Sequence, residues 1–407
     1  MKRLSVLMAV AFVDMIGLML VAPLMPFYAL RLHAAEWLVG PLIASFALAQ
    51  LLSSTVWGRV SDRYGRRPAI LIGLGAAGFA YLIFGFATSL WMLFASRIVQ
   101  GMGGGTTGVL QAYVTDAIPP SERAKALGWL SAATSAGVVI GPFIGSAAYT
   151  FGSAAPGVVA AVLVLINVTF AWRWLPESRP PHGRPSNPDG AAVGAEPRSV
   201  KQALWEIVSH PSRPAHRVIW IYVVGMLALN VVIGVLALYL KDTFGVTEKT
   251  IGLFFPIFGV VGVLMRATLV GSVNERLGEV RTMQLGTALL AAGLFLMPLP
   301  AAFGMSASLV LFILFLILVP AGTALLFPAS TSLVSQRTDR REVGLVMGAQ
   351  QTFRGVMSIV GPVGGTLVFD KLGHGVPFLM AAAVVCIAGI LAAREPRAEP
   401  ASATIKA

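Results

Sequence analysis

The chain has 407 residues, of which 56% are hydrophobic and 12% charged, with a formal net charge of +12. A water-soluble domain is about 45–50% apolar and about 25% charged, so this composition excludes a protein that has water as its main solvent. The positive balance would suit nucleic-acid binding, but the basic residues alternate with long apolar runs, as loops between membrane helices do.

Twelve apolar stretches follow one another along the chain, each close to the roughly 20 residues that a helix needs to cross a bilayer. The run after Met1 is too long for a signal-peptide core, so we interpret it as the first of these membrane helices. We therefore predict an all-α polytopic membrane protein without a large extramembrane domain. Its helices are expected at residues 5–30, 37–57, 69–88, 90–115, 125–149, 155–175, 217–240, 249–270, 282–303, 306–335, 343–369 and 374–393.

The first predicted helix contains Asp14, the only carboxylate deep within an apolar stretch. Burial of a carboxylic acid favours its neutral form, and a group that loads a proton on one side of a membrane and releases it on the other needs such an environment. We hypothesise that Asp14 carries a coupling proton or senses a cationic substrate. A structural hydrogen bond to a neighbouring helix is the alternative.

The loop GRVSDRYGRRP, residues 58–68, joins the second and third helices. Gly58 and Gly65 would allow a tight turn, and Asp62 places a carboxylate among the arginines Arg59, Arg63, Arg66 and Arg67. Such a carboxylate can meet the positive end of a helix and guanidinium groups at once. A loop that only sets topology needs the arginines but neither Asp62 nor the glycines, so we predict that this loop also makes specific contacts with a neighbouring helix.

The fourth helix carries Arg97 about seven residues from one end and finishes at Asp116. A charge at that depth costs about 2.5–3.5 kcal/mol and normally faces a cavity or a partner, although a long side chain can also snorkel outward. The fifth helix contains four residues that favour close approach of a neighbouring helix or a bend in the axis: Gly137, Gly141, Pro142 and Gly145. Simple helix packing is the alternative for these glycines.

The hydrophilic residues 176–216 separate an N-terminal half, 1–175, from a C-terminal half, 217–393, and 394–407 form a tail. The linker begins rich in Pro, Gly and Ser, as flexible linkers do. It then becomes amphipathic, and its apolar side chains could face the lipid surface or belong to a merely solvated helix. Those side chains are Leu204, Trp205 and Val208.

The two halves repeat one another. Residues 58–65 recur at 271–278 with an offset of 213, whereas 122–128 and Gly141-Pro142 recur at an offset of 220. Parallel six-helix repeats place a substrate site between the halves and allow alternating access by rocking. The repeat therefore indicates a transporter.

The distribution of charge predicts the orientation. With the N-terminus inside, only four of the 30 Lys and Arg residues lie in outer loops, three lie within helices and 23 lie on the inner side. Positive loops stay on the cytoplasmic side. We expect a bacterial cytoplasmic (inner) membrane protein with both termini in the cytoplasm.

Candidate substrate contacts lie mainly in the second half, at Asn230, Gln350, Gln351 and Arg354. Arg354 lies near mid-membrane, where it would suit an anionic substrate or pair with Asp14. Aromatic residues could wall an apolar pocket, although in membrane helices they more often pack or face lipid. The candidates are Tyr113, Trp129, Phe327 and Phe353.

Together these motifs resemble the major facilitator superfamily, and within it the twelve-helix drug–proton antiporters related to multidrug and tetracycline exporters. The loop 58–68 matches the superfamily signature. The other matches are Asp14-x-x-Gly17 with Pro23 and Pro26, Arg97-x-x-Gln100-Gly101 with Gly103 to Gly105, and Gly128, Gly137, Gly141-Pro142 and Gly145. The resemblance implies that Arg97 takes part in proton movement. It also implies that Asp62, Arg66 and Asp116 form a cytoplasmic charge network that docks near residues 342–348 and acts as a gate. The other residues of this gating motif are Gly58, Arg63, Gly65 and Arg67.

The expected function is secondary active export of lipophilic small molecules, driven by proton antiport. Export of a specific metabolite, sugar or lipid-linked compound with an anionic group is the alternative. Tetracycline itself is not expected, because Ala80 stands where tetracycline exporters have a third-helix acid and the ninth helix has none. The expected partners are the substrate, protons and the lipid bilayer, with no nucleic acid, and the chain is expected to be a monomer.

Other function classes fit poorly. The five histidines lie in loops or at helix ends, away from any nucleophile or carboxylate pair that an enzyme would need. The chain lacks the GxxxxGK[ST] motif of ATP-driven machines and a filter-like loop of a channel. Its single cysteine, Cys386, offers neither a disulfide nor a metal cluster. We therefore expect no cofactor and no metal.

Overall fold

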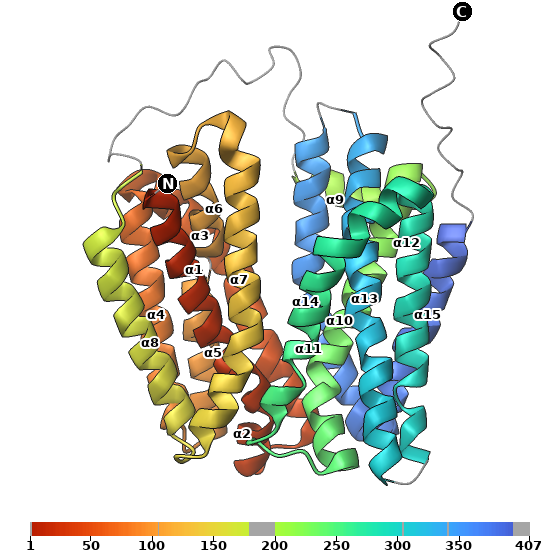
Figure 1. The fold of residues 1–407 in the computed structure, drawn as a ribbon, viewed down its shortest axis with the longest axis horizontal. Coiled ribbons are helices and arrows are strands. Elements are labelled where there is room, and N and C mark those ends of the chain that lie inside the picture. Colours follow the sequence, from red (N-terminus) through yellow and green to blue (C-terminus); the bar gives the residue numbers. More distant parts are fainter. Residues whose placement is uncertain (1, 105, 179–199, 303–304, 340–341, 394–407) are drawn as a thin grey trace, which may run out of the picture. The chain divides into compact units, whose positions relative to one another are not determined.

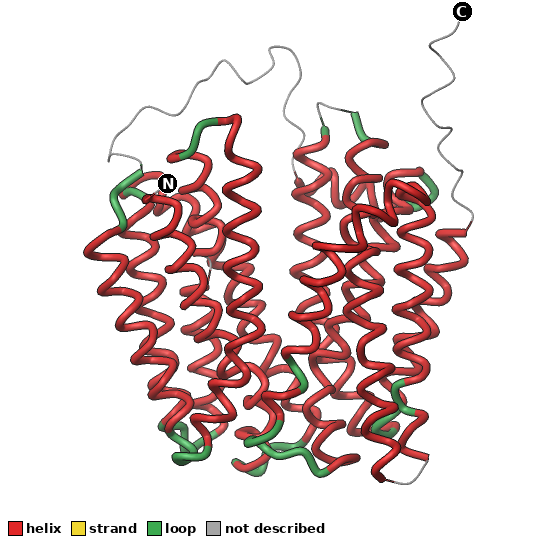
Figure 2. The backbone as a smooth tube through the Cα atoms, in the orientation of Figure 1, coloured by secondary structure: helices red, strands yellow, loops and turns green. Residues whose placement is uncertain are grey.

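The structure is a computed structural model that describes residues 2–104, 106–178, 200–302, 305–339 and 342–393. Throughout these ranges it is built of helices and loops, without a strand (Figure 2). Most of the predicted linker and the predicted tail, residues 179–199 and 394–407, lie outside the described residues, as does Gly105 of the fourth-helix motif.

Eight α-helices occupy the first 174 residues. The first predicted span consists of α1 (Lys2–Val21), a short 3-10 turn that contains Pro23, and α2 (Met25–Arg31). The helices that follow are α3 (Val39–Tyr64), α4 (Arg66–Gly85), α5 (Leu90–Gly104), α6 (Thr106–Ala117), α7 (Pro120–Tyr149) and α8 (Ala155–Trp174). Proline lacks an N–H and its ring clashes with the preceding turn, which accounts for the break between α1 and α2.

Seven further helices follow: α9 (Val200–Ser209), α10 (Pro214–Phe244), α11 (Pro256–Leu264), α12 (Val270–Leu296), α13 (Met305–Arg337), α14 (Val343–Leu372) and α15 (Val376–Ala393). Within the described ranges, ten helical segments are long and apolar enough to cross a membrane. One of them, Ile251–Ala301, has 51 residues and turns at Gly278, which has a φ of 75°. At 1.5 Å per residue that segment is long enough for two crossings. The pattern agrees with the predicted fold of twelve membrane helices.

The chain forms two compact units. The first combines the described residues before 179 with 231–260 and 358–374, and the second combines 200–230, 261–357 and 375–393. In the first unit α1 packs against α7 and α8, and α4 packs against α5 and α8 (Figure 1). In the second unit α12 packs against α13 and α15.

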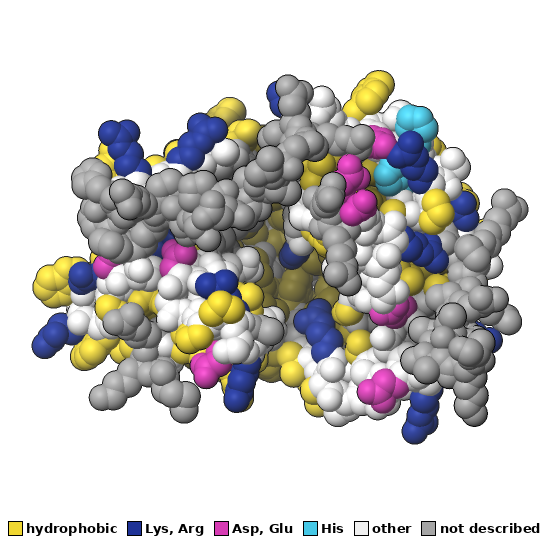
Figure 3. Space-filling view, turned by 90° about the horizontal axis from the view of Figure 1, so that it is seen from above, with side chains coloured by type: hydrophobic (Ala, Val, Ile, Leu, Met, Phe, Trp, Pro, Cys, Tyr) yellow, Lys and Arg dark blue, Asp and Glu magenta, His cyan; other side chains and the backbone are white. Residues whose placement is uncertain are grey.

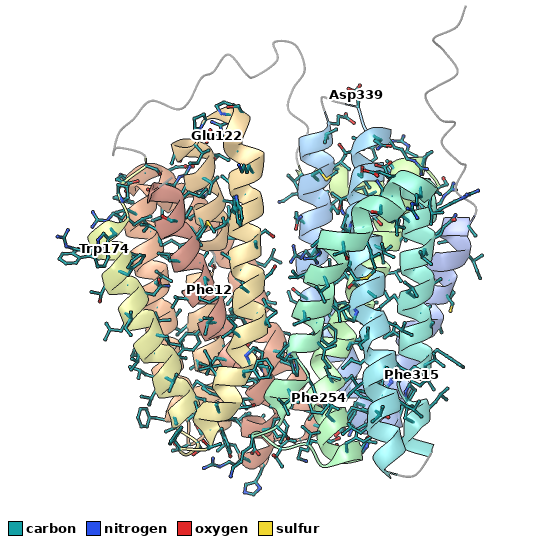
Figure 4. All side chains as sticks on the ribbon, viewed as in Figure 1. Phe12, Glu122, Trp174, Phe254, Phe315 and Asp339 are labelled. Atoms are coloured by element: carbon teal, nitrogen blue, oxygen red, sulfur yellow. The ribbon has the colours of Figure 1, made fainter. Side chains whose placement is uncertain are left out.

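Large apolar side chains point outward from the helices. Trp91 is 82% exposed and Phe151 is 88% exposed. Trp174, at the end of α8, is 56% exposed and points away from its helix (Figure 4). Such side chains suit a lipid solvent, and Trp is enriched where a membrane helix meets the interface.

Basic side chains gather at one end of the molecule. Figure 3 looks onto the end that carries the N-terminal residues, where Lys and Arg side chains stand out. We call the opposite end of the first unit the distal end, and it comprises the loops at residues 32–38, 86–89, 150–154, 245–250 and 373–374.

Segments from both predicted halves meet at the distal end. The Thr366 hydroxyl donates to the Trp37 carbonyl at 3.1 Å. On α7, the Ser146 hydroxyl donates to the Glu248 carbonyl and accepts from the Gly252 N–H, both at 2.8 Å. The distal end of this unit is therefore held together by contacts between residues more than 100 positions apart in the chain.

Candidate functional site

A polar cluster, which we call the buried polar cluster, lies among α1, α4 and α5. It consists of the buried residues Tyr81, Arg97 and Gln100 and the partly exposed Asp14. Tyr81 is 1% exposed, and its hydroxyl accepts a hydrogen bond from Gln100 Nε2 at 2.7 Å. The Asp14 carboxylate and the Arg97 guanidinium both lie within electrostatic range of that hydroxyl. The Tyr81 hydroxyl thus lies near both the Asp14 carboxylate on α1 and the Arg97 guanidinium on α5.

Local packing explains why Tyr81 reaches α1. Gly17 lies one turn after Asp14, and a Cβ atom at Gly17 would stand 3.2 Å from the Tyr81 hydroxyl. The missing side chain therefore leaves room for the tyrosine ring against the backbone of α1. The Ser96 hydroxyl donates to the Ala80 carbonyl at 2.9 Å and fixes α5 against α4 next to this ring.

Arg97 is turned into the protein. Its side chain is 3% exposed, and its Nε and Nη2 atoms have no hydrogen-bond partner among the described residues. The alternative of outward snorkelling is therefore wrong for Arg97. Within the same described ranges no hydrogen bond or ion pair reaches the Asp14 carboxylate, so the structural hydrogen bond considered for it is not found. Buried polar groups without partners are costly, and within a membrane they mark functional sites.

The helix that carries Asp14 is bound closely by α7. A Cβ atom at Gly137 would lie 2.8 Å from the Phe12 carbonyl, one at Gly141 would lie 2.8 Å from the Ile16 carbonyl, and one at Gly145 would lie 2.2 Å from the Leu20 carbonyl. These three glycines form one face of α7 that touches the backbone of α1, and we call this contact the glycine seam. Gly128 does not belong to it, because nothing lies within 4 Å of its Cβ position.

A charge network surrounds Arg66, whose side chain is 8% exposed. Arg66 Nε donates to Asp116 Oδ2 at 2.8 Å, and Arg66 Nη1 pairs with Asp62 Oδ1 at 2.9 Å. The structure therefore brings together Asp62, Arg66 and Asp116, whereas Arg63 lies apart with its guanidinium over the Tyr64 ring. The predicted association of these three charges is observed.

The turn of this motif is shorter than predicted. Helix α3 continues to Tyr64 and nothing lies within 4 Å of the Gly58 Cβ position, so the prediction that Gly58 shapes the turn is wrong. The turn occurs at Gly65, where φ is 104°. Only glycine adopts that conformation without strain.

Sequence reasoning missed Glu177, which caps α4. Its carboxylate accepts from the backbone N–H groups of Arg66 at 2.8 Å and Arg67 at 3.0 Å. These are free N–H groups at a helix N-terminus, where a negative charge is stabilising. The only signal was an acid directly after the sixth predicted helix, 111 residues from its partner.

In the second unit, Arg354 is exposed and lies within electrostatic range of Tyr222. The Tyr222 ring packs on Phe327 at 5.2 Å, and Trp220 packs on Phe353 at 5.7 Å. The predicted residues Phe327, Phe353 and Arg354 thus belong to one region, to which Trp220 and Tyr222 of α10 add two aromatic rings that the prediction did not include.

The remaining candidates are engaged in other ways. Asn230 donates to the Met226 carbonyl of its own helix at 2.8 Å. Gln350 is 2% exposed and donates to the Thr331 hydroxyl at 3.3 Å. Gln351 is exposed. Trp129 on α7 is 52% exposed.

Tyr113 is buried and bonded to the chain after α8. Its ring is 1% exposed, and its hydroxyl donates to the Pro176 carbonyl at 2.7 Å. This tyrosine ties α6 to the chain just after α8, and its contact with a substrate stays a prediction.

Comparison with known proteins gives consistent results. The family model of the Major Facilitator Superfamily matches residues 7–268 and 218–406. Multidrug resistance protein 2 of Bacillus subtilis (strain 168) is 30% identical over 384 residues, which cover 94% of this chain and 92% of that protein. Tetracycline resistance protein, class G, of Vibrio anguillarum is 28% identical, with 90% of this chain and 91% of that protein covered.

Solved structures share the fold at low sequence identity. The human organic anion transporter MFSD10 (TETRAN) has a TM-score of 0.67 and 19% identity, with 96% of this chain and 99% of that chain covered. The POT family transporter PepTSo has a TM-score of 0.75 and 13% identity, with 96% of this chain and 97% of that chain covered.

Proposed function

Because the chain belongs to the Major Facilitator Superfamily, we propose that it is a secondary active exporter of lipophilic small molecules that takes up protons in exchange. The names of its relatives support the substrate class, since both multidrug and tetracycline resistance proteins match over about nine-tenths of the chain. The observation that carries proton coupling is the Asp14 carboxylate, which lies in the buried polar cluster beside Tyr81 and within the helix bound by the glycine seam.

Protonation of Asp14 would alter the contact between α1 and α4. The ionised carboxylate can accept a strong hydrogen bond from the Tyr81 hydroxyl, whereas the neutral carboxyl group is a weaker acceptor. Proton loading would thus weaken the hold of α4 on α1. Because α7 touches the backbone of α1 at the glycine seam, a shift of α1 would displace α7 as well.

The proposed orientation places the distal end outside the cell and both termini in the cytoplasm of a bacterium. The excess of Lys and Arg in loops on the other side supports this orientation, and the bacterial source of the multidrug resistance relative supports a bacterial membrane. We further propose that the exporter works as a monomer, because each chain holds both halves of the repeat.

The test uses purified protein in proteoliposomes with a pH-sensitive dye inside. Addition of a transported lipophilic cation should release protons from the binding site in the wild-type chain, and a protonophore should abolish uphill transport. Asp14→Asn should abolish substrate-driven proton flux, whereas Asp339→Asn, which removes an exposed aspartate at the end of α13, should not. If Asp14→Asn elutes normally in size-exclusion chromatography and keeps the wild-type proton flux, Asp14 does not carry the coupling proton.

A second candidate function rests on Arg354. An exposed guanidinium beside Tyr222 and its aromatic neighbours suits a compound that has an anionic group next to an apolar body. Export assays with matched cationic, neutral and anionic compounds, tetracycline included, distinguish the two functions. If the chain exports a specific anionic metabolite, only that class should move, and Arg354→Gln should abolish its transport.

A further inference from the structure

Three titratable side chains converge at the distal end. They are Glu36 in the turn before α3, Asp242 near the end of α10 and His374 just after α14, and their carboxylate oxygens and ring nitrogen all lie within 4.8 Å of one another. The three come from positions more than 100 residues apart in the chain, and the buried polar cluster around Asp14 does not include them. We call them the distal triad.

The surroundings of the triad are also charged. Asp370 lies within electrostatic range of Glu36, Lys241 pairs with Asp242 at 3.1 Å, and Lys371 pairs with Asp370 at 2.7 Å. The His374 ring stacks on the Phe369 ring with a centroid distance of 4.5 Å and an interplanar angle of 5°. This stacking holds the imidazole in place, so its proximity to the two carboxyl groups follows from packing.

The triad bridges the segments that close the distal end. Glu36 belongs to the N-terminal half, and Asp242 and His374 belong to the C-terminal half. Beside them, the Thr366 hydroxyl donates to the Trp37 carbonyl, and a Cβ atom at Gly40 would lie 2.4 Å from the Pro362 carbonyl. Opening of this end requires Glu36 to leave its two partners, so the charges of the triad act directly on the closure.

Two carboxylates at such short range repel one another unless one takes up a proton or a cation lies between them. A protonated Glu36 can donate a hydrogen bond to Asp242, and a protonated imidazole attracts both carboxylates. Both protonations favour contact. As the pH rises and both protons are lost, two negative groups remain face to face, with Asp370 as a third, and Lys241 offsets only part of this repulsion.

We propose that the distal triad is a pH-responsive latch, which keeps the distal end closed when it carries protons and releases it when it loses them. With the distal end outside, as in the proposed function, an acidic exterior would hold the outer gate shut. A proton that arrives at the outer surface would thus influence access as well as drive transport. Only this physiological interpretation rests on the proposed function, because the conformational response itself needs neither substrate nor gradient.

The experiment measures distances across the distal end in the full-length protein in lipid nanodiscs. Spin labels are attached to Trp91→Cys and Leu372→Cys, two exposed positions, in a Cys386→Ser background that removes the single native cysteine. Pulsed EPR then gives the ratio of short to long distances between pH 5 and pH 8, without substrate. One linked proton changes such a ratio by up to tenfold per pH unit, so we expect the ratio of short to long distances to rise about tenfold between pH 8 and pH 5.

Glu36→Gln is the decisive variant, because it removes the negative charge and keeps the shape and the ability to donate to Asp242. It should favour the short distance at every pH and reduce the tenfold response to about threefold or less. Glu122→Gln, an exposed acid at the start of α7 at the opposite end (Figure 4), should keep the full response. If Glu36→Gln does not fold, Asp242→Asn makes the same comparison.

An unchanged pH response in the folded Glu36→Gln protein would overturn the proposal. So would a wild-type closure that disappears on addition of EDTA, since a divalent cation rather than a proton would then hold the triad together. The proposed function is tested separately: it fails if the wild-type protein shows no substrate-driven proton flux in proteoliposomes. That result would leave the distances measured in nanodiscs unaffected.

Discussion

A methyl group added at Gly141 measures how tightly α7 and α1 are joined. In Gly141→Ala the new Cβ atom would lie 2.7 Å from the Met19 Cβ, 2.8 Å from the Ile16 carbonyl oxygen and 3.0 Å from the Leu20 nitrogen, whereas ordinary contact begins at 3.4 Å. Two of these three atoms are backbone atoms that no side-chain rotation can move. The two helices must therefore separate by about half an ångström along part of the glycine seam.

Overpacking of this kind costs about 1–3 kcal/mol. Replacement of glycine by alanine within a helix otherwise gains about 0.5–1 kcal/mol, and Gly128→Ala receives that gain without a clash, because its Cβ position is open. The difference between the two variants on α7 therefore isolates the overpacking. Gly145→Ala extends the series, since its Cβ would lie only 2.2 Å from the Leu20 carbonyl.

The assay is the apparent Tm of the purified variants in one detergent, read from the monomer peak in size-exclusion chromatography after heating. For a chain of this length about 1 °C corresponds to 1 kcal/mol if it unfolds as a unit. We expect Gly141→Ala to melt about 1–3 °C below Gly128→Ala, and Gly145→Ala lower still. Equal Tm values for the three variants would refute the conclusion that the seam is in backbone contact.

Two further predictions concern single polar groups. Glu177→Ala should destabilise the protein by about 0.5–2 kcal/mol, because it leaves two N–H groups at the start of α4 without their acceptor. The control is Glu275→Ala, which removes an exposed acid. Equal Tm values for the two variants would contradict the capping role of Glu177. Tyr81→Phe should slow proton-coupled transport about tenfold, since loss of a buried hydrogen-bond partner costs about 1–3 kcal/mol. Tyr113→Phe removes a buried hydroxyl outside the polar cluster and should leave the proton dependence of transport unchanged, and an equal loss in both variants would contradict a special role for Tyr81.

Composition and periodicity predicted the membrane helices well, because the bilayer imposes a length and an apolar character that a single sequence displays. The internal repeat was equally readable. Gly65 and Gly278 occupy corresponding positions at the offset of 213, and both adopt positive φ, at 104° and 75°. The association of Asp62, Arg66 and Asp116 was predictable in part because the resemblance to a known family supplied it.

Contacts between residues far apart in the chain could not be predicted from the sequence. Glu177 follows α8 in a Pro-rich stretch, and nothing in its neighbourhood indicates that its carboxylate reaches the start of α4. Tyr113 is a second case, because an aromatic residue in a membrane helix is equally compatible with a pocket wall and with the hydrogen bond to the Pro176 carbonyl. Which face of a helix is buried depends on its neighbours, and a chain without strong amphipathic periodicity does not reveal this.

Helix α7 connects the helix that carries Asp14 with the distal end. On one face its glycines touch the backbone of the helix that carries Asp14, and one residue after Gly145 the Ser146 hydroxyl binds the chain at Glu248 and Gly252. Because no side chains lie between α7 and α1 to absorb displacement, a movement of the helix that carries Asp14 would be passed directly to the contacts at the distal end. Looser packing along α7 should then produce slippage, in which protons and substrate cross independently even though each binding site is intact.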